Sequence, residues 1–159
     1  MKNTQPFKAG RHLIVIDIEN LTGTPSPSAD EVAAAITGLR AVVAGFDDAQ
    51  KVVACSHHAA RIVPFVFPNA RYLWRSGPDG ADLALLDVME NERVDERFER
   101  VTICSGDGAF ASAAAWLARA GVVVTAVSLS GHLAARLRLA ARHVAFLPPS
   151  LAATAGSAS

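Results

Sequence analysis

The chain has 159 residues, of which 51% are hydrophobic and 19% charged, and fifteen Lys and Arg balance fifteen Asp and Glu. This apolar content is enough for one packed domain and excludes wholesale disorder. A formal net charge of zero excludes a uniformly basic surface, so any contact with nucleic acid has to be a local patch.

The two ends of the chain lack the patterns of a folded core. Residues 1–10 are polar, and residues 149–159 are small and low in complexity. We therefore expect a flexible N-terminus, a single domain over residues 11–148 and a flexible C-terminal tail. The first residues lack the apolar core of a leader, and no apolar stretch reaches the ~20 residues of a membrane span, so we expect a cytoplasmic protein without membrane contact.

The first half of the domain is predicted to alternate between strands and helices. Residues 13–16 are a short apolar run, typical of a buried strand, and residues 20–28 carry Gly and Pro and are predicted to be a loop. Apolar residues at helical spacing predict a helix over 29–44, and a second strand follows at 51–55. Ser56 then caps a predicted helix through about Val66.

The rest of the domain continues this alternation. In chain order we expect a strand over 70–74, a helix over 79–91, a strand over 101–104, a helix over 108–120, a strand over 122–127, a helix from the cap Ser130 to Arg142, and an edge strand over 144–147. The pattern predicts an α/β three-layer sandwich around a mainly parallel, Rossmann-like sheet of five to six strands. Cys55 and Cys104 each end a strand and are expected to be reduced core residues.

Acidic side chains follow the predicted strands where a parallel sheet binds its ligands. Asp17 directly follows the first strand, and Asp107 comes two residues beyond the strand 101–104. Asp82 lies in the first turns of the helix after the third strand, on the same side of the sheet. Since the carboxyl ends of parallel strands share one edge, we expect these three side chains to meet in one cleft.

Three carboxylates in one cleft repel one another unless a hard divalent cation neutralises them, which predicts a site for Mg²⁺ or Mn²⁺. Such a cation polarises a phosphoryl oxygen and lowers the pKa of a bound water. The chemistry that follows is metal-dependent hydrolysis of a phosphodiester.

Three segments carry a resemblance to a known family. They read IDIENL at 16–21, GADLALLD at 80–87 and VTICSGDGAF at 101–110, and with the residues that follow they resemble the NYN domain family of the PIN-like nuclease superfamily over residues 12–147. The resemblance implies an RNA-cleaving endonuclease that leaves 5′-phosphate and 3′-hydroxyl ends, and a sheet whose first and fourth strands are neighbours. It also implies roles for five residues: Asp17, Asp82 and Asp107 as metal-binding catalytic carboxylates, and Asn20 and Ser105 as their supports.

One position departs from the family pattern. The family commonly reads S-G-D-x-D-F, whereas this chain has Ala109 in SGDGAF. With one acid missing, a second cation would bind weakly, which favours a one-metal or slow enzyme. Glu19 and Asp79 are the residues that would compensate.

Two basic clusters are candidates for an RNA surface. Arg71 and Arg75 flank Tyr72 and Trp74, which places cations beside aromatic rings on which single-stranded bases can stack, although Trp74 is equally typical of a core. The predicted last helix carries Arg136, Arg138 and Arg142 as a second basic cluster, in which Arg136 and Arg138 cannot share one narrow face and which solubility explains almost equally well. The same helix is rich in Ala, which makes a homodimer a further prediction.

Other interpretations remain open for these residues. Asp107 can act as a helix cap, Asp82 as a surface acid, and Asn20 as an Asx turn. A catalytically weak module that binds RNA or a protein partner is the main alternative to the nuclease. A phosphatase with Asp17 as nucleophile is disfavoured, because Glu19 stands where its second Asp belongs, and no GxGxxG follows the first strand to bind a dinucleotide.

Overall fold

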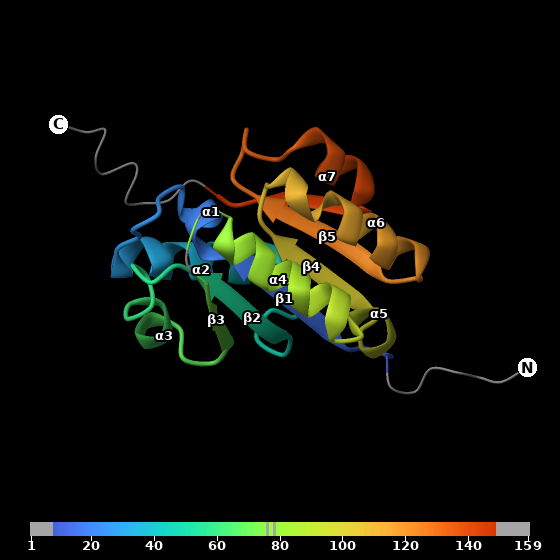
Figure 1. Ribbon diagram of the computed structural model, residues 1–159, viewed down its shortest axis with the longest axis horizontal. Helices are drawn as coiled ribbons and strands as arrows, with labels where there is room; N and C mark the ends of the chain where they lie inside the picture. Colours follow the sequence, from blue (N-terminus) through green and yellow to red (C-terminus); the bar gives the residue numbers. More distant parts are fainter. Residues whose placement is uncertain (1–7, 76, 78, 149–159) are drawn as a thin grey trace, which may run out of the picture.

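The computed structural model describes residues 8–75, 77 and 79–148 (Figure 1). Most of the predicted flexible N-terminus and the whole predicted C-terminal tail, 149–159, lie outside these residues; residues 8–10 form a turn. No helix among the described residues combines the length and the apolar composition needed to cross a bilayer.

The described strands form one parallel sheet in the order β3-β2-β1-β4-β5-β6. They are β1 (His12–Asp17), β2 (Gln50–Cys55), β3 (Arg71–Trp74), β4 (Arg100–Cys104), β5 (Val123–Ser128) and β6 (His143–Phe146). Every predicted strand is present, with ends within one residue of the prediction. The prediction of a three-layer α/β sandwich with a sixth strand at one edge is confirmed.

Helices cover both faces of the sheet (Figure 1). One face packs against α1 (Ile18–Thr22), α2 (Ala29–Val42) and α3 (Val63–Val66). The other packs against α4 (Gly80–Asn91), α5 (Val94–Arg97), α6 (Ala111–Arg119) and α7 (Ala135–Ala140), with a short 3₁₀ helix, η1 (Gly108–Phe110), before α6.

Two of the predicted helical or loop segments were wrong at their ends, and one short helix was not predicted. Residues 20–22 belong to α1 rather than to a loop, because the side chain of Asp17 caps this short helix. The segment after Ser56 forms turns, and α3 begins only at Val63, where Pro64 is tolerated in the first helical turn. The helix that was not predicted is α5, a single turn.

The last helix also differs from its prediction, since α7 begins at Ala135 and not at the predicted cap Ser130. Gly131 has φ 79°, a left-handed conformation that interrupts a helix. The backbone N–H of Ala134 donates to the carbonyl of Gly106 at 2.8 Å, so the segment before α7 is fixed against the end of β4.

The side chains of β1 alternate between two cores. Leu13 and Val15 pack with α4 and α6, whereas Ile14 and Ile16 pack with α1 and α2, and all four are buried. This burial on both faces explains the unbroken apolar run of a central parallel strand. By the same alternation Asp17 points to the α4 face of the sheet.

The neighbouring strands β1 and β4 mark the point where the chain changes direction. From β1 the chain continues through α1 and α2 on one face, and from β4 it continues through α6 on the other. The register pairs Ile16 with Cys104, so the residues that follow each strand lie side by side. In doubly wound sheets this switch point is where ligands bind.

Candidate functional site

Three carboxyl groups gather at the switch point between β1 and β4. Asp17, the last residue of β1, is 5% exposed, and Asp82, in the first turn of α4, is 6% exposed. Asp107 lies in the β4–η1 connection and is half-buried. Asp82 lies close enough to Asp17 and to Asp107 for each of them to act on its pKa, so the structure brings the three predicted residues together as one acid cluster.

The two predicted supporting residues lie inside the same site. The hydroxyl of Ser105 is 3.5 Å from Oδ2 of Asp17 and accepts the backbone N–H of Asp107 at 3.2 Å. The side-chain oxygen of Asn20 accepts the backbone N–H of Gly106 at 2.9 Å, which ties the end of β1 to the end of β4. Asn20, in α1, therefore bonds to the β4–η1 connection instead of closing an Asx turn in a loop of its own.

Gly106 is the residue on which this arrangement depends most strictly. A Cβ at this position would lie 2.0 Å from the carbonyl oxygen of His132 and 2.6 Å from Oγ of Ser128. Only glycine lets the β4–η1 connection and the segment before α7 approach this closely. Packing thus explains the glycine of the sequence Ser105-Gly106-Asp107, whose two polar side chains belong to the site.

Burial and mutual interaction shift the pKa values of the three carboxyls in different directions. Burial, followed by hydrogen bonds with Asp17 and Asp107, raises the pKa of Asp82 to about 9. Burial also raises the pKa of Asp17. Hydrogen bonds with Asp82 and with the Ala109 backbone N–H, together with the charge of Arg136, hold the pKa of Asp107 below its usual range. A pKa of about 9 means that Asp82 keeps its proton at neutral pH.

The donor chemistry of the cluster fits a hard divalent cation, because Asp17, Asp82 and Asp107 all offer carboxyl oxygens. Among the described residues, no group of three or more His, Cys, Asp or Glu side chains could hold a metal ion as arranged. None of the ion pairs in the described chain includes Asp17, Asp82 or Asp107, so no basic side chain neutralises them directly.

The positions that were considered for a fourth acid lie around the cluster. Ala109 is exposed in η1. Oε1 of Glu19 accepts the backbone N–H of Ser56 at 2.7 Å, which engages this carboxylate at the end of β2. Asp79 is exposed in a left-handed conformation, φ 60°, and its side chain makes no capping hydrogen bond. None of these contacts puts a fourth carboxyl into the cluster.

The residues around β3 that were proposed for RNA binding do not form one surface. Arg71 begins β3, at the opposite end of the strand from Trp74, and its guanidinium pairs with Glu92 at 2.6 Å. Trp74 is 43% exposed and stacks on Tyr72, with ring centroids 5.7 Å apart. Tyr72 packs on the α2 side, and by strand alternation Trp74 shares its face, which is opposite to that of Asp17. Arg75 is exposed just beyond the strand.

One arginine of the second basic cluster lies at the site, which the sequence did not indicate. Arg136, in the first turns of α7, packs against Gly108: a Cβ there would lie 2.4 Å from Nε of the arginine. The only sign in the sequence is the glycine itself, since nothing else separates Arg136 from Arg138 and Arg142. Leu139 of the same helix is 87% exposed, and the homodimer stays a prediction.

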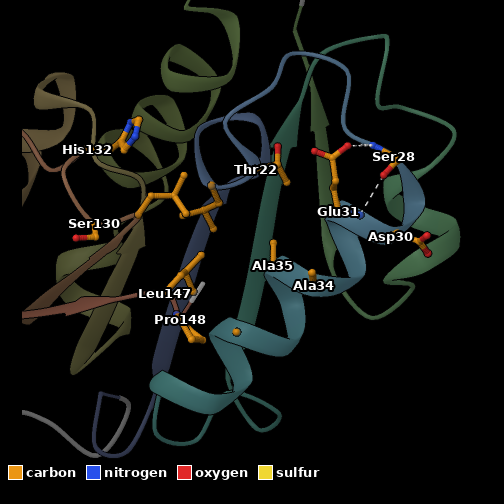
Figure 2. A pocket seen from close by; sticks show the side chains of 13 residues that line it. Thr22, Ser28, Asp30, Glu31, Ala34, Ala35, Ser130, His132, Leu147 and Pro148 are labelled. Atoms are coloured by element: carbon orange, nitrogen blue, oxygen red, sulfur yellow. Dashed lines mark hydrogen bonds between the residues drawn. The ribbon is translucent and has the colours of Figure 1, made fainter. Parts of the chain in front are cut away.

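A pocket of about 770 Å³ adjoins the site on the other face of the sheet. Figure 2 shows Ser130 and His132 on one side of it, Thr22 and α2 on the other, and Leu147 and Pro148 between them. The acid Glu31 on its wall is engaged in the capping box of α2 with Ser28.

The fold and the site together define a doubly wound α/β protein with an acid cluster at its switch point. No family model matches the chain, and a search of curated proteins finds no match. Among solved structures, the chain is similar to a protein of unknown function from Vibrio parahaemolyticus, with a TM-score of 0.59 and 14% identity. The match covers 91% of this chain and 96% of that one, and it shows the fold alone.

Proposed function

We propose that this protein is a metal-dependent endoribonuclease whose reaction centre is the acid cluster of Asp17, Asp82 and Asp107. The observation that carries the proposal is the meeting of these carboxyls, from β1, α4 and the β4–η1 connection, at the switch point. A structural role does not explain why an acid with a pKa near 9 is kept inside a cluster of acids.

The three carboxyls would hold one Mg²⁺ or Mn²⁺, which take oxygen ligands and retain several waters. When bound, the cation supplies the charge that polarises a phosphoryl oxygen and acidifies water. The supporting residues act on the carboxyls: Ser105 orients Asp17, and Asn20 fixes the loop that carries Asp107.

RNA as substrate and membership of the NYN domain family rest on the resemblance of the segments 16–21, 80–87 and 101–110. The fold is consistent with both, since the segments converge on one edge with β1 beside β4. Arg75 and Trp74 remain candidates for contacts with a longer RNA, whereas Arg71 is held by Glu92. Cys55 and Cys104 are buried and unpaired, which agrees with a cytoplasmic location.

A second candidate function is a binding module that keeps the fold but turns over slowly or not at all. The observation that favours it is the exposed Ala109 at the position where the family carries an acid, together with the absence, among the described residues, of a group arranged to hold a metal. Such a module would still bind RNA, or a protein partner, at the same edge.

Cleavage of a labelled single-stranded RNA with Mn²⁺ separates these functions. We expect products with 5′-phosphate and 3′-hydroxyl ends, no cleavage with a chelator, and a loss of roughly a hundredfold or more in Asp107→Asn, as several kcal/mol of transition-state stabilisation disappear.

Asp87→Asn is the control for this experiment, because Asp87 is an exposed acid of α4 outside the cluster. Cleavage that survives Asp107→Asn unchanged contradicts the site. Binding of the RNA without any cleavage by the wild-type protein favours the second candidate.

A further inference from the structure

We propose that Arg136 binds a phosphate of the substrate beside the acid cluster and so positions the RNA for cleavage. The inference rests on the proposed function and extends it to one residue of the second basic cluster, to which the resemblance assigns no role. Its basis is the contact of the Arg136 side chain with Gly108, one residue from Asp107.

The placement of Arg136 follows from two close approaches of the backbone. Ala134 N–H donates to the carbonyl of Gly106, and the carbonyl of His132 fills the space beside the same glycine. These contacts fix the start of α7 against the β4–η1 connection. The helix then directs Arg136 onto Gly108, where a Cβ would lie 2.4 Å from Nε and 3.1 Å from Cζ.

The guanidinium of Arg136 is available to bind an anionic ligand. Within the described residues it takes part in none of the ion pairs and donates none of the side-chain hydrogen bonds, although its charge is close enough to act on Asp107. The side chain is exposed, so a substrate can reach it. An arginine fork binds two phosphate oxygens at once, a geometry that the ammonium of lysine lacks.

The other arginines of this region do not share the position. Arg138 follows two residues later, about 200° around the helix axis, and so points away from Gly108. The backbone N–H of Arg142 donates to the carbonyl of Val124 near the start of β5. Arg142 therefore lies toward the amino ends of the strands, whereas the acid cluster lies at their carboxyl ends. Arg138→Ala is therefore the matched control for a general loss of positive charge.

The first test compares Arg136→Ala, Arg136→Lys and Arg138→Ala on the same short single-stranded RNA with Mn²⁺. We expect Arg136→Ala to lower kcat/KM roughly ten- to hundredfold, mainly through a higher KM, because a charge-assisted hydrogen bond is lost. Arg136→Lys should recover part of this loss, and Arg138→Ala should behave as the wild type. In RNA binding, the logarithm of the association constant decreases linearly with the logarithm of the salt concentration. This slope should become less steep by about 0.7 in Arg136→Ala and stay unchanged in Arg138→Ala.

Gly108→Ala gives a second test that leaves the charge in place. The new Cβ meets only the far end of a flexible side chain, so the protein should fold and the arginine should move. We expect a loss of cleavage in this variant and little additional loss when it is combined with Arg136→Ala. Thermal melts of each variant check that the fold is retained.

The outcomes distinguish this inference from the function on which it rests. If Asp107→Asn abolishes cleavage while Arg136→Ala cleaves and binds as Arg138→Ala does, the role of Arg136 is overturned and the nuclease stands. If the wild-type protein binds RNA without cleaving it, the change in the salt slope alone decides the role of Arg136. If it neither binds nor cleaves this RNA, both proposals fall.

Discussion

The side-chain oxygen of Asn20 accepts the backbone N–H of Gly106 across 2.9 Å, and this hydrogen bond joins two connections that are 86 residues apart in the chain. Since Asp17 precedes one partner and Asp107 follows the other, the bond sets the spacing of two carboxyls of the acid cluster. Asn20 thus acts on the site without touching the reacting atoms.

Replacing Asn20 with Ala should lower the free energy of unfolding by about 1–2 kcal/mol, because the Gly106 N–H loses its partner in a partly buried place. Asn20→Asp keeps an acceptor oxygen and should lose less. Urea denaturation measures both variants. An Asn20→Ala protein as stable as the wild type would show that this bond contributes nothing to the fold.

Asp82→Asn should make the metal-free protein more stable at neutral pH. The folded-state pKa of about 9 means that folded Asp82 holds a proton that the unfolded chain releases near pH 4, so this carboxyl costs stability as the pH rises from about 4 to about 9. An amide avoids this cost and can donate to Asp17 and Asp107. We expect a gain on the order of 1–3 kcal/mol near neutral pH, which shrinks in acid.

Mn²⁺ should reverse that ranking in thermal melts. The cation should raise the Tm of the wild type, because binding to the folded state alone stabilises it, and should leave Asp82→Asn unchanged. Asp87→Asn, with its substitution on the exposed side of α4, is the control for both measurements. A Tm of the wild type that does not respond to Mn²⁺ or Mg²⁺ argues against a cation in the cluster.

Ala109→Asp should strengthen the proposed cation site by placing an acid at its rim. Residue 109 is exposed in the first turn of η1, where a negative charge is tolerated, so folding should be unaffected. The Mn²⁺ concentration for half-maximal cleavage should fall roughly three- to tenfold, since affinity follows the number of anionic ligands. Ala109→Asn matches the size without the charge, and an equal effect of both substitutions would refute the electrostatic explanation.

His12 should make stability depend on pH in mild acid. It is buried at the start of β1, and its Nε2 lies 2.7 Å from Oγ1 of Thr102. Burial, with the charges of Arg100 and Lys51, lowers the pKa of His12 to about 4. The unfolded chain takes up a proton near pH 6.5 that the folded protein refuses, so stability falls as the pH drops from about 6.5 to about 4.

His12 contributes at most about 3 kcal/mol to the free energy of unfolding. Urea unfolding at several pH values between about 4 and 6.5 measures this contribution. His12→Gln keeps a partner for Thr102 and should flatten the profile. His143→Gln removes an exposed imidazole of β6 and serves as the control. A wild-type profile that is already flat would contradict the burial of a neutral imidazole.

The sequence was sufficient to predict the sheet and the placement of the acids. Runs such as 13–16 and 101–104 are almost entirely apolar because both faces of a central parallel strand are buried. This pattern can be recognised in a single sequence, without an alignment of homologues. Once the strands are placed, Asp17 and Asp107 must reach the same edge. The side on which α4 carries Asp82 follows from the chain direction.

The sequence was not sufficient where the structure depends on contacts between loops. The packing of His132 against Gly106 delays α7 to Ala135 and sets the direction of Arg136, and no periodicity encodes such an approach. The separation of Arg71 from Trp74 by the length of β3 could have been predicted from the strand assignment. It was missed because nearness in sequence was taken for nearness in space.

The position of β1 in the middle of the sheet has a consequence for synthesis of the protein. Its neighbour on one side, β2, leaves the ribosome early, whereas on the other side His12 has to wait for Arg100. Until then the apolar strand presents an unpaired edge, the feature that makes nascent chains prone to aggregate. A late stall in translation should therefore leave this chain dependent on chaperones, and completion of β4 should end that dependence.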